Sequence, residues 1–360
     1  MKPSWFCHER TPGATTIGRR AVAIVVALAA FVAAMPQQPL AAAEPAAVSI
    51  EGDLLRKTLE SQGYVAVDIT RRKSGYLTTN VQIGEAKLQL LVDTGAVTTC
   101  LDRARTEVLG LRWKSATIGG DSKATQLKGV EAKAITIDVC PLQSLKIGSV
   151  SASPLDATHI NTFPFNSILR ADGEPPLDGF LGDDVLTSRA AVIDYPNGRM
   201  YLQPTGAKPS LAEGEAVRKR LSLQGYVCVD LDRGRIGYLA KSAQVEAVEL
   251  YFMVDTGAPL TYLDLGRTDK KGLRWTFDAK PDPMSRLGSY RCDLETLNIG
   301  GITLNSVSAV PHDMASFNSY MTTIGGREVD GLLGNDVLTK HAAVVDVAGR
   351  RLFLQPAGKR

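Results

Sequence analysis

The feature that most constrains the fold is a long internal repeat, because the second half of the chain aligns with the first. A shift of 162 residues places residues 62–65 on 224–227. After ten extra residues in the first copy, a shift of 152 places residues 178–206 on 330–358, with 17 of 29 positions identical. This period is far longer than the roughly 20–50 residues of solenoid or propeller repeats. It is the size of a compact domain, so the sequence predicts two copies of one domain.

Each copy has the pattern of β structure. Short apolar stretches rich in Val, Ile and Tyr alternate with Gly, Asn, Pro and Asp, which form turns. Helical periodicity is scarce. The predicted strands include residues 190–194, 200–202, 342–346 and 352–354, and the predicted short helices are residues 54–61, 184–188, 216–223 and 336–340.

These patterns predict an all-β fold of two tandem lobes, each with a short helix. The predicted organisation is a signal peptide at residues 1–43, an N-terminal segment at 44–62, a first lobe at 63–206, a linker at 207–224 and a second lobe at 225–360.

The N-terminus has the pattern of a secretory signal peptide. Arg19 and Arg20 precede fifteen uncharged residues, 21–35, and the small residues 41–43 fit a cleavage site. The apolar run is shorter than the about 20 residues of a membrane span. We expect residues 1–43 to be removed and the protein to be exported, to the periplasm or outside the cell. The alternative is an uncleaved anchor at residues 21–35, and only that arrangement predicts membrane contact.

The charge of the chain argues against nucleic-acid binding. The formal net charge is +3, and the predicted signal peptide, with four basic residues and one acidic residue, accounts for all of it. A mature chain without net positive charge lacks the electrostatic footprint of nucleic-acid binding proteins.

Four cysteines remain after the predicted cleavage, Cys100, Cys140, Cys228 and Cys292. An exported chain can form disulfides, and four cysteines allow three pairings. Their spacing does not match a zinc site, and no Cys-x-x-Cys is present. We expect these cysteines to be paired or simply buried, and we expect no metal and no cofactor.

The motif Asp-Thr-Gly-Ala occurs at aligned positions in the two copies, each time directly after a short apolar run. A strand that breaks into a Gly turn places its carboxylate at the strand end, where it can face a cleft. Two such turns can bring Asp93 and Asp255 together. A carboxyl pair that shares one proton can activate water, so the repeated motif predicts a catalytic pair.

With both motifs in place, the chain resembles the retropepsin-like (retroviral-type) aspartic proteases, in particular exported bacterial members with two tandem lobes. The resemblance covers residues 63–206 and 225–358. It rests on the two Asp-Thr-Gly-Ala motifs and on an apolar pair followed by Gly in each copy, Phe180-Leu181-Gly182 and Leu332-Leu333-Gly334. It implies that the two lobes are β-barrels of the acid-protease type. It also implies an aspartic endopeptidase in which Asp93 and Asp255 hold the attacking water between the two lobes.

The resemblance also implies roles for the residues around the two carboxylates. Thr94 and Thr256 are expected to cross-bond the two turns, while Gly95 and Gly257 let the backbone pass close and donate N–H bonds to the carboxylates. The loops that support the turns from below are expected at Leu181, Gly182, Leu333 and Gly334. A flap tip is expected at Ile118, Gly119 and Gly120. The matching stretch of the second copy contains prolines, so the two flaps are expected to differ.

Two other interpretations remain open. The chain could be a non-catalytic peptide-binding or assembly protein on a protease-like scaffold, because a fold does not guarantee activity. The lobes could also pair between two chains in a homodimer, whereas the tandem repeat favours an intramolecular pseudo-dimer. In the enzymatic interpretation the partner is a peptide or protein substrate, whose sequence preference cannot be read from the chain.

Overall fold

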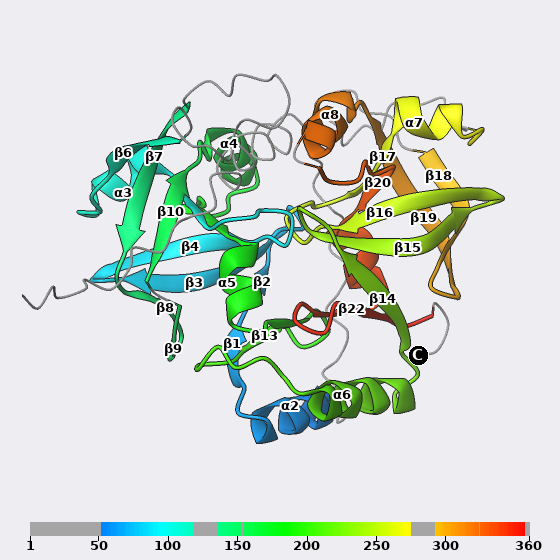
Figure 1. The fold of residues 1–360 in the computed structure, drawn as a ribbon, viewed down its shortest axis with the longest axis horizontal. Coiled ribbons are helices and arrows are strands. Elements are labelled where there is room, and N and C mark those ends of the chain that lie inside the picture. Colours follow the sequence, from blue (N-terminus) through cyan, green and yellow to red (C-terminus); the bar gives the residue numbers. More distant parts are fainter. Residues whose placement is uncertain (1–51, 119–134, 153, 275–291, 324, 357–360) are drawn as a thin grey trace, which may run out of the picture.

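The structure is a computed structural model, and it describes residues 52–118, 135–152, 154–274, 292–323 and 325–356 (Figure 1). The predicted signal peptide, the predicted flap residues Gly119 and Gly120, and the matching second-copy stretch at 275–291 lie outside the described residues. Within the described part of the chain, no helix is both long enough and apolar enough to cross a membrane.

The first repeat builds a lobe around a ten-stranded sheet, drawn in cyan and green in Figure 1. Its path runs β6-β7-β10-β5-β11-β4-β3-β8-β9, and β2 pairs with β3. The strands are β2 (Thr70–Arg71), β3 (Leu77–Ile83), β4 (Ala86–Val92), β5 (Cys100–Leu101), β6 (Lys114–Ile118), β7 (Ile135–Leu142), β8 (Leu145–Ile147), β9 (Val150–Ser151), β10 (Leu155–His159) and β11 (Gly179–Leu181).

The second repeat builds the other lobe from part of a twelve-stranded sheet. The strands of this lobe run β15-β16-β20-β17-β19-β18, and β15 also pairs with β18, which closes the layer on itself. The strands are β15 (Tyr238–Val245), β16 (Val248–Val254), β17 (Thr261–Asp264), β18 (Cys292–Ile299), β19 (Ile302–His312) and β20 (Gly331–Leu333).

The other half of this sheet joins the two repeats. Three strands of the first repeat lie beside three of the second in the order β1-β13-β12-β21-β22-β14, and Ile193 of β12 lies opposite Val345 of β21. The four middle strands of this order are buried at nearly every residue, whereas the outer two, β1 and β14, are mostly half-buried. The buried pairing of the middle strands therefore holds the lobes against each other. The six strands are β1 (Val65–Asp68), β12 (Val192–Asp194), β13 (Arg199–Leu202), β14 (Val227–Arg233), β21 (Val344–Asp346) and β22 (Arg351–Leu354).

Two helices cover the joining sheet, at the bottom of Figure 1. They are α2 (Gly52–Ser61) and α6 (Leu211–Leu223), and their buried residues Leu59 and Leu221 pack with Tyr201 and Phe353 of the joining strands. Helix α6 occupies most of the predicted linker. It begins before residue 216, where the sequence analysis placed it, because Ser210 and Glu213 form a capping box.

The fold is mainly β with some helices, and each lobe has the expected short helix and two more. The described part of each lobe has three helices, which occupy aligned positions. They are α3 (Arg103–Glu107), α4 (Phe163–Ala171) and α5 (Asp183–Ser188) in the first lobe, and α7 (Leu265–Lys270), α8 (Ala315–Thr323) and α9 (Asn335–Lys340) in the second. The helices predicted at 184–188 and 336–340 are confirmed to within one residue. Helices α4 and α8, of nine residues each, were not predicted.

The strands expected at residues 190–194 and 342–346 begin two residues later than predicted. Ala190 and Ala342 each have a positive φ, 47° and 48°, and turn the chain out of the preceding helix. Among the described residues, no disulfide joins the four cysteines: Cys100, Cys140 and Cys292 are buried and Cys228 is half-buried.

Candidate active site

Each Asp-Thr-Gly turn follows a central strand that a Leu-Gly loop supports. The short strand before that loop runs parallel to the Asp-bearing strand, β11 beside β4 and β20 beside β16. The N–H of Asp93 donates to the carbonyl of Leu181 at 3.0 Å, and the N–H of Asp255 donates to that of Leu333 at 3.1 Å. The loops therefore hold the first residue of each turn at the end of its strand.

Glycine is required in both supporting loops because the backbones come too close for a side chain. A Cβ at Gly182 would lie 2.4 Å from the carbonyl carbon of Thr98, and one at Gly334 would lie 2.0 Å from the carbonyl oxygen of Leu260. No real Cβ makes such contacts with backbone atoms, so these glycines allow the loops to pack against the turns.

The two turns are bound to each other by their threonines. The backbone N–H of Thr94 donates to Oγ1 of Thr256 at 3.0 Å, and the N–H of Thr256 donates to Oγ1 of Thr94 at 3.1 Å. Each hydroxyl then donates across the interface, from Thr94 to Val254 O at 2.9 Å and from Thr256 to Val92 O at 2.8 Å. The structure thus contains the cross-bonding that the resemblance implied, and all four bonds are buried.

The two carboxylates meet over the glycines of these turns. A Cβ on Gly257 would lie 2.4 Å from Cγ of Asp93, and a Cβ on Gly95 would lie 3.0 Å from Oδ1 of Asp255. Each carboxylate therefore lies against the glycine of the opposite turn. This packing brings together two groups that are separated by 162 residues in the sequence.

Both carboxylates are 1% exposed and accept backbone hydrogen bonds. Oδ1 of Asp93 accepts from the N–H groups of Gly95 and Ala96 at 2.8 and 3.0 Å, and Oδ1 of Asp255 accepts from Gly257 at 2.8 Å. Oδ2 of Asp255 is buried and accepts no N–H bond from the described part of the chain, and the side chains of Asp93 and Asp255 hydrogen-bond each other.

The surroundings raise the pKa of both carboxyl groups. Burial, followed by the charge of Asp255, raises the pKa of Asp93 well above its usual value. Burial raises the pKa of Asp255 to about 6, although hydrogen bonds from Gly257 and Ala258 oppose that rise. Two like charges this close cannot both form easily, so the pair retains one proton into the mildly acidic range.

Other repeated acidic residues have structural roles. Asp184 accepts from the hydroxyl of Thr99 at 2.8 Å, and Asp336 accepts from that of Thr261 at 2.8 Å. These bonds tie each helix after the Leu-Gly loop to its neighbouring strand. Likewise, Asp194 and Asp346 lie at strand ends and accept N–H bonds within the following turns.

One pair of supporting residues was missed by the sequence analysis. Asn166 of α4 accepts from the N–H of Leu177 at 2.6 Å and donates to its carbonyl at 3.0 Å, and Asn318 of α8 makes the same two bonds with Val329. Both helices are thereby fixed to the segment that leads into the Leu-Gly loop. The repeated Phe-Asn-Ser was the available signal, but sequence alone gave no partner for the amide.

The predicted flap residue Ile118 is the last residue of β6, which pairs antiparallel with β7.

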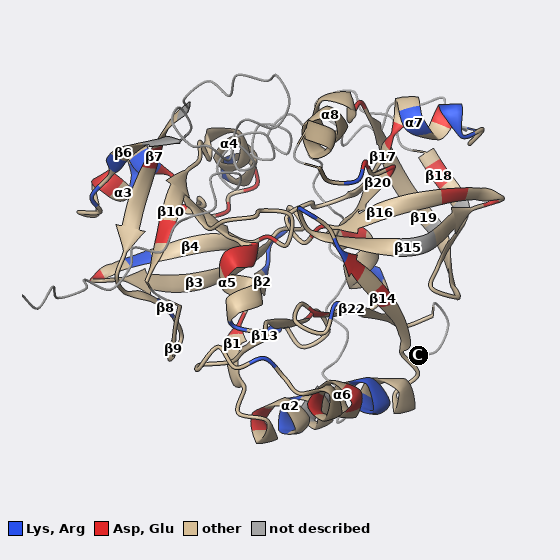
Figure 2. Cartoon of the chain, in the orientation of Figure 1, with Lys and Arg blue, Asp and Glu red and all other residues tan. Residues whose placement is uncertain are grey.

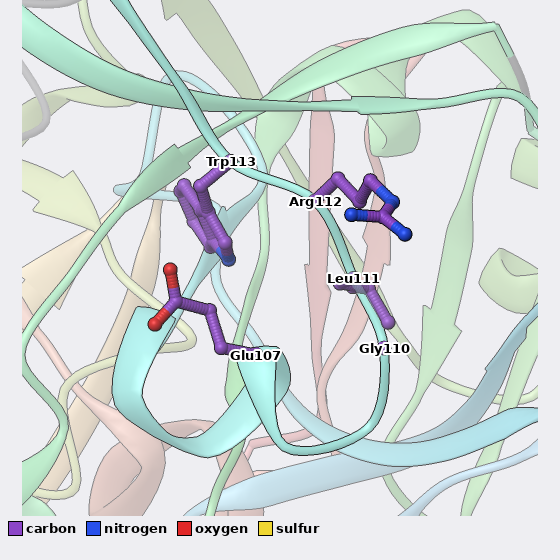
Figure 3. Close-up of a pocket in the computed structure, with 5 residues that line it drawn as sticks. All are labelled: Glu107, Gly110, Leu111, Arg112 and Trp113. Atoms are coloured by element: carbon purple, nitrogen blue, oxygen red, sulfur yellow. The ribbon is translucent and has the colours of Figure 1, made fainter.

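A cavity of about 380 Å³ lies next to the start of β6, and neither Asp93 nor Asp255 lines it. Figure 3 shows its lining by Glu107, Gly110, Leu111, Arg112 and Trp113. Within the described residues, no group of three or more His, Cys, Asp or Glu side chains is placed to hold a metal ion.

No protein-family model matches the chain, and no curated protein matches its sequence. Among solved structures, the crystal structure of the aspartic proteinase from Irpex lacteus is similar with a TM-score of 0.42 and 15% sequence identity. That similarity covers 82% of this chain and 98% of the other.

Proposed function

We propose that the protein is an aspartic endopeptidase in which Asp93 and Asp255 activate a water molecule. A single observation carries the proposal: two buried carboxylates, one from each repeat, lie against the glycines of each other's turns. Buried hydrogen bonds between the backbone N–H groups and hydroxyl groups of Thr94 and Thr256 hold the two turns together. The positions of the carboxylates are therefore fixed by short, buried groups. Such rigid placement of reacting groups is what catalysis by positioning requires.

The chemistry follows from one proton shared by the two carboxyl groups. The ionised carboxylate takes a proton from water while the water oxygen attacks the peptide carbonyl carbon. At the same time, the protonated carboxyl group gives its proton to the carbonyl oxygen. The resulting tetrahedral intermediate collapses when the carbon–nitrogen bond breaks. The leaving nitrogen receives a proton from one carboxyl group while the other recovers one from the intermediate, which restores the singly protonated pair.

The experiment that tests this proposal is cleavage of a peptide library by the mature protein, with and without pepstatin, and by the variants Asp93→Asn and Asp255→Asn. We expect each single variant to lose hydrolysis by about 10⁴-fold or more, because neither carboxyl group can perform both proton transfers alone. Near-wild-type turnover by either variant would refute the shared pair.

The same experiment addresses the arrangement of the active unit. We propose an intramolecular pair, because the hydrogen bonds between the turns and the joining sheet both connect the two repeats. Equal amounts of the two inactive variants, mixed together, should therefore not regain activity. Recovery on mixing would indicate that lobes pair between chains.

A second candidate is a non-catalytic peptide-binding or assembly protein. The observation in its favour is the 1% exposure of both carboxylates, since a substrate must reach them. This candidate predicts saturable peptide binding without cleavage, and binding that survives in the Asp→Asn variants.

A further inference from the structure

Next to each Asp-Thr-Gly turn, the first residue of a short helix links the turn to the opposite repeat. Asp183 begins α5, and its N–H donates to the carbonyl of Ala96 at 2.7 Å. Asn335 begins α9, and its N–H donates to the carbonyl of Ala258 at 2.9 Å. The two positions are aligned in the repeat, but one side chain is a carboxylate and the other is an amide.

In the first lobe the helix presents an ionic group to the other repeat. The carboxylate of Asp183 accepts from the hydroxyl groups of Thr187 and Tyr238 at 2.8 and 2.7 Å, and it is paired with the guanidinium of Arg233. Tyr238 and Arg233 belong to the second repeat, and the guanidinium lies 4.6 Å from the centre of the Tyr238 ring. Figure 2 shows the acidic first turn of α5 at this place.

In the second lobe the corresponding link is neutral and reaches further. The hydroxyl of Tyr195, from the first repeat, donates to Oδ1 of Asn335 at 2.6 Å, and Nδ2 of Asn335 donates to the carbonyl of Thr256 at 2.9 Å. Thr339, the counterpart of Thr187, has a buried hydroxyl without a hydrogen-bond partner in the described residues. The neutral link therefore uses a different set of residues from the ionic one.

The Thr256 carbonyl matters because it shares a planar peptide unit with the N–H of Gly257. That N–H donates to Oδ1 of Asp255 at 2.8 Å. A hydrogen bond that fixes the carbonyl therefore also fixes the direction of the N–H that faces the carboxylate. In the first lobe Asp183 is a carboxylate, which cannot donate a hydrogen bond to the equivalent carbonyl of Thr94.

We propose that Asn335 is a positioning residue for Asp255, held by the hydroxyl of Tyr195 in the other repeat. The inference rests on the proposed role of Asp255 in the carboxyl pair. An amide is required at this position because it must accept from Tyr195 and donate to Thr256 at the same time. Asp183 and Arg233 make the corresponding link for the first lobe without contacting the Thr94 carbonyl, so the two carboxylates are oriented differently.

The test compares Tyr195→Phe and Asn335→Asp with the matched control Tyr238→Phe. The first readout is a pH titration of ¹³C-labelled Asp carboxyl groups by NMR. The signal of Asp255 is the one that is present in the wild-type spectrum and missing from the spectrum of Asp255→Asn. Tyr195→Phe should raise the apparent pKa of Asp255 by roughly half a unit, because a looser Gly257 N–H stabilises its charged form less. Asn335→Asp should raise it further, because the added carboxylate also repels the charge. Tyr238→Phe should leave this titration unchanged.

The second readout is kcat and KM on a peptide that the wild-type protein cleaves. Tyr195→Phe should lower kcat by about 10-fold with little change in KM, because orientation is lost and not substrate contact. A Tyr195→Phe protein that titrates and turns over like wild type would overturn the inference, as would an equal shift in Tyr238→Phe. If wild type cleaves no peptide, the proposed function fails, and the titration alone decides the role of Asn335. Tyr195→Phe removes one oxygen atom, so it tests the inference even if Asn335→Asp does not fold.

Discussion

Around Asp93 and Asp255 the two lobes make nearly the same contacts, whereas the residues that pack behind these turns differ. The aspartates, threonines and glycines of the two turns, and the glycines of the supporting loops, have matching partners at similar distances. Behind them, an ion pair in the first lobe corresponds to a tyrosine–asparagine bond in the second. The comparison indicates that the geometry of the carboxyl pair tolerates little change, whereas the layer that supports it can be built in different ways.

The cores of the two lobes show the same freedom in side-chain size. Phe180 lies directly opposite Cys100 on neighbouring strands of the first lobe, and Leu332 lies opposite Tyr262 at the aligned place in the second. All four side chains are buried. The first lobe pairs the large Phe180 with the small Cys100, whereas the second pairs Leu332 with the large Tyr262. The second pair is larger overall, so the two lobes fill this place with different side-chain volumes.

The largest effect on stability that we expect is a pH dependence caused by the carboxyl pair. Measuring this dependence tests whether Asp93 and Asp255 are equivalent. Both pKa values are raised in the folded protein, so the folded state keeps a proton that the unfolded state has already lost. The contribution of the pair to the free energy of unfolding should therefore be greatest below about pH 4 and should fall as the pH rises through about 6, with Asp255 alone contributing about 3 kcal/mol.

Asp93→Asn and Asp255→Asn should each flatten this dependence and make the protein more stable than wild type at pH 7. Urea denaturation at a series of pH values measures it. If only one variant flattened the curve, the two halves of the pair would not be equivalent. Curves parallel to that of wild type would show that neither carboxyl group is perturbed.

The next effect distinguishes the ionic link from the neutral one. Arg233→Met should lower the free energy of unfolding by about 3 kcal/mol, because it leaves the Asp183 carboxylate, 5% exposed, without its cation. Tyr195→Phe, which breaks the neutral link to Asn335, should lower the free energy of unfolding by only about 1 kcal/mol, because it removes a hydrogen bond between uncharged groups. The control is Arg218→Met, whose partner Glu215 is exposed and 3.9 Å away. A loss for Arg233→Met no greater than for this control would mean that this partly buried ion pair does not hold the lobes together.

The smallest effect concerns the exchanged core pairs. Cys100→Tyr should destabilise the first lobe by about 2 kcal/mol through overpacking against Phe180. Phe180→Leu in the same protein should recover at least half of that loss, since it recreates the pair found in the second lobe. A double-mutant cycle from thermal or urea unfolding measures the coupling. Additive losses would contradict the proposed exchange of volume.

Much of the fold and of the candidate site could be predicted from the sequence because the signals were local and repeated. The strand before each aspartate, the turn itself and the Leu-Gly loop depend on residues within a few positions of one another, and the structure places them as expected. The contacts that fix α4 and α8 could not be predicted, because Asn166 and Asn318 bond to segments eleven residues further along the chain. An asparagine in a sequence does not indicate which backbone groups it will meet.

By itself, the sequence determined that the chain contains two copies of one β-rich domain and that each copy presents an aspartate in a glycine turn. These properties follow from alternating apolar residues, from turn-forming residues and from the alignment of the copies. Only the tertiary structure decided which groups meet across the two repeats. Tyr195 and Asn335 are 140 residues apart, and Arg233 and Asp183 are 50 apart. Their contacts depend on how the joining strands β12 and β21 pair. Aligned positions look equivalent in the sequence, but these four residues contact the opposite repeat. Their partners therefore depend on the register in which the two repeats pair, and not on neighbouring residues in the chain.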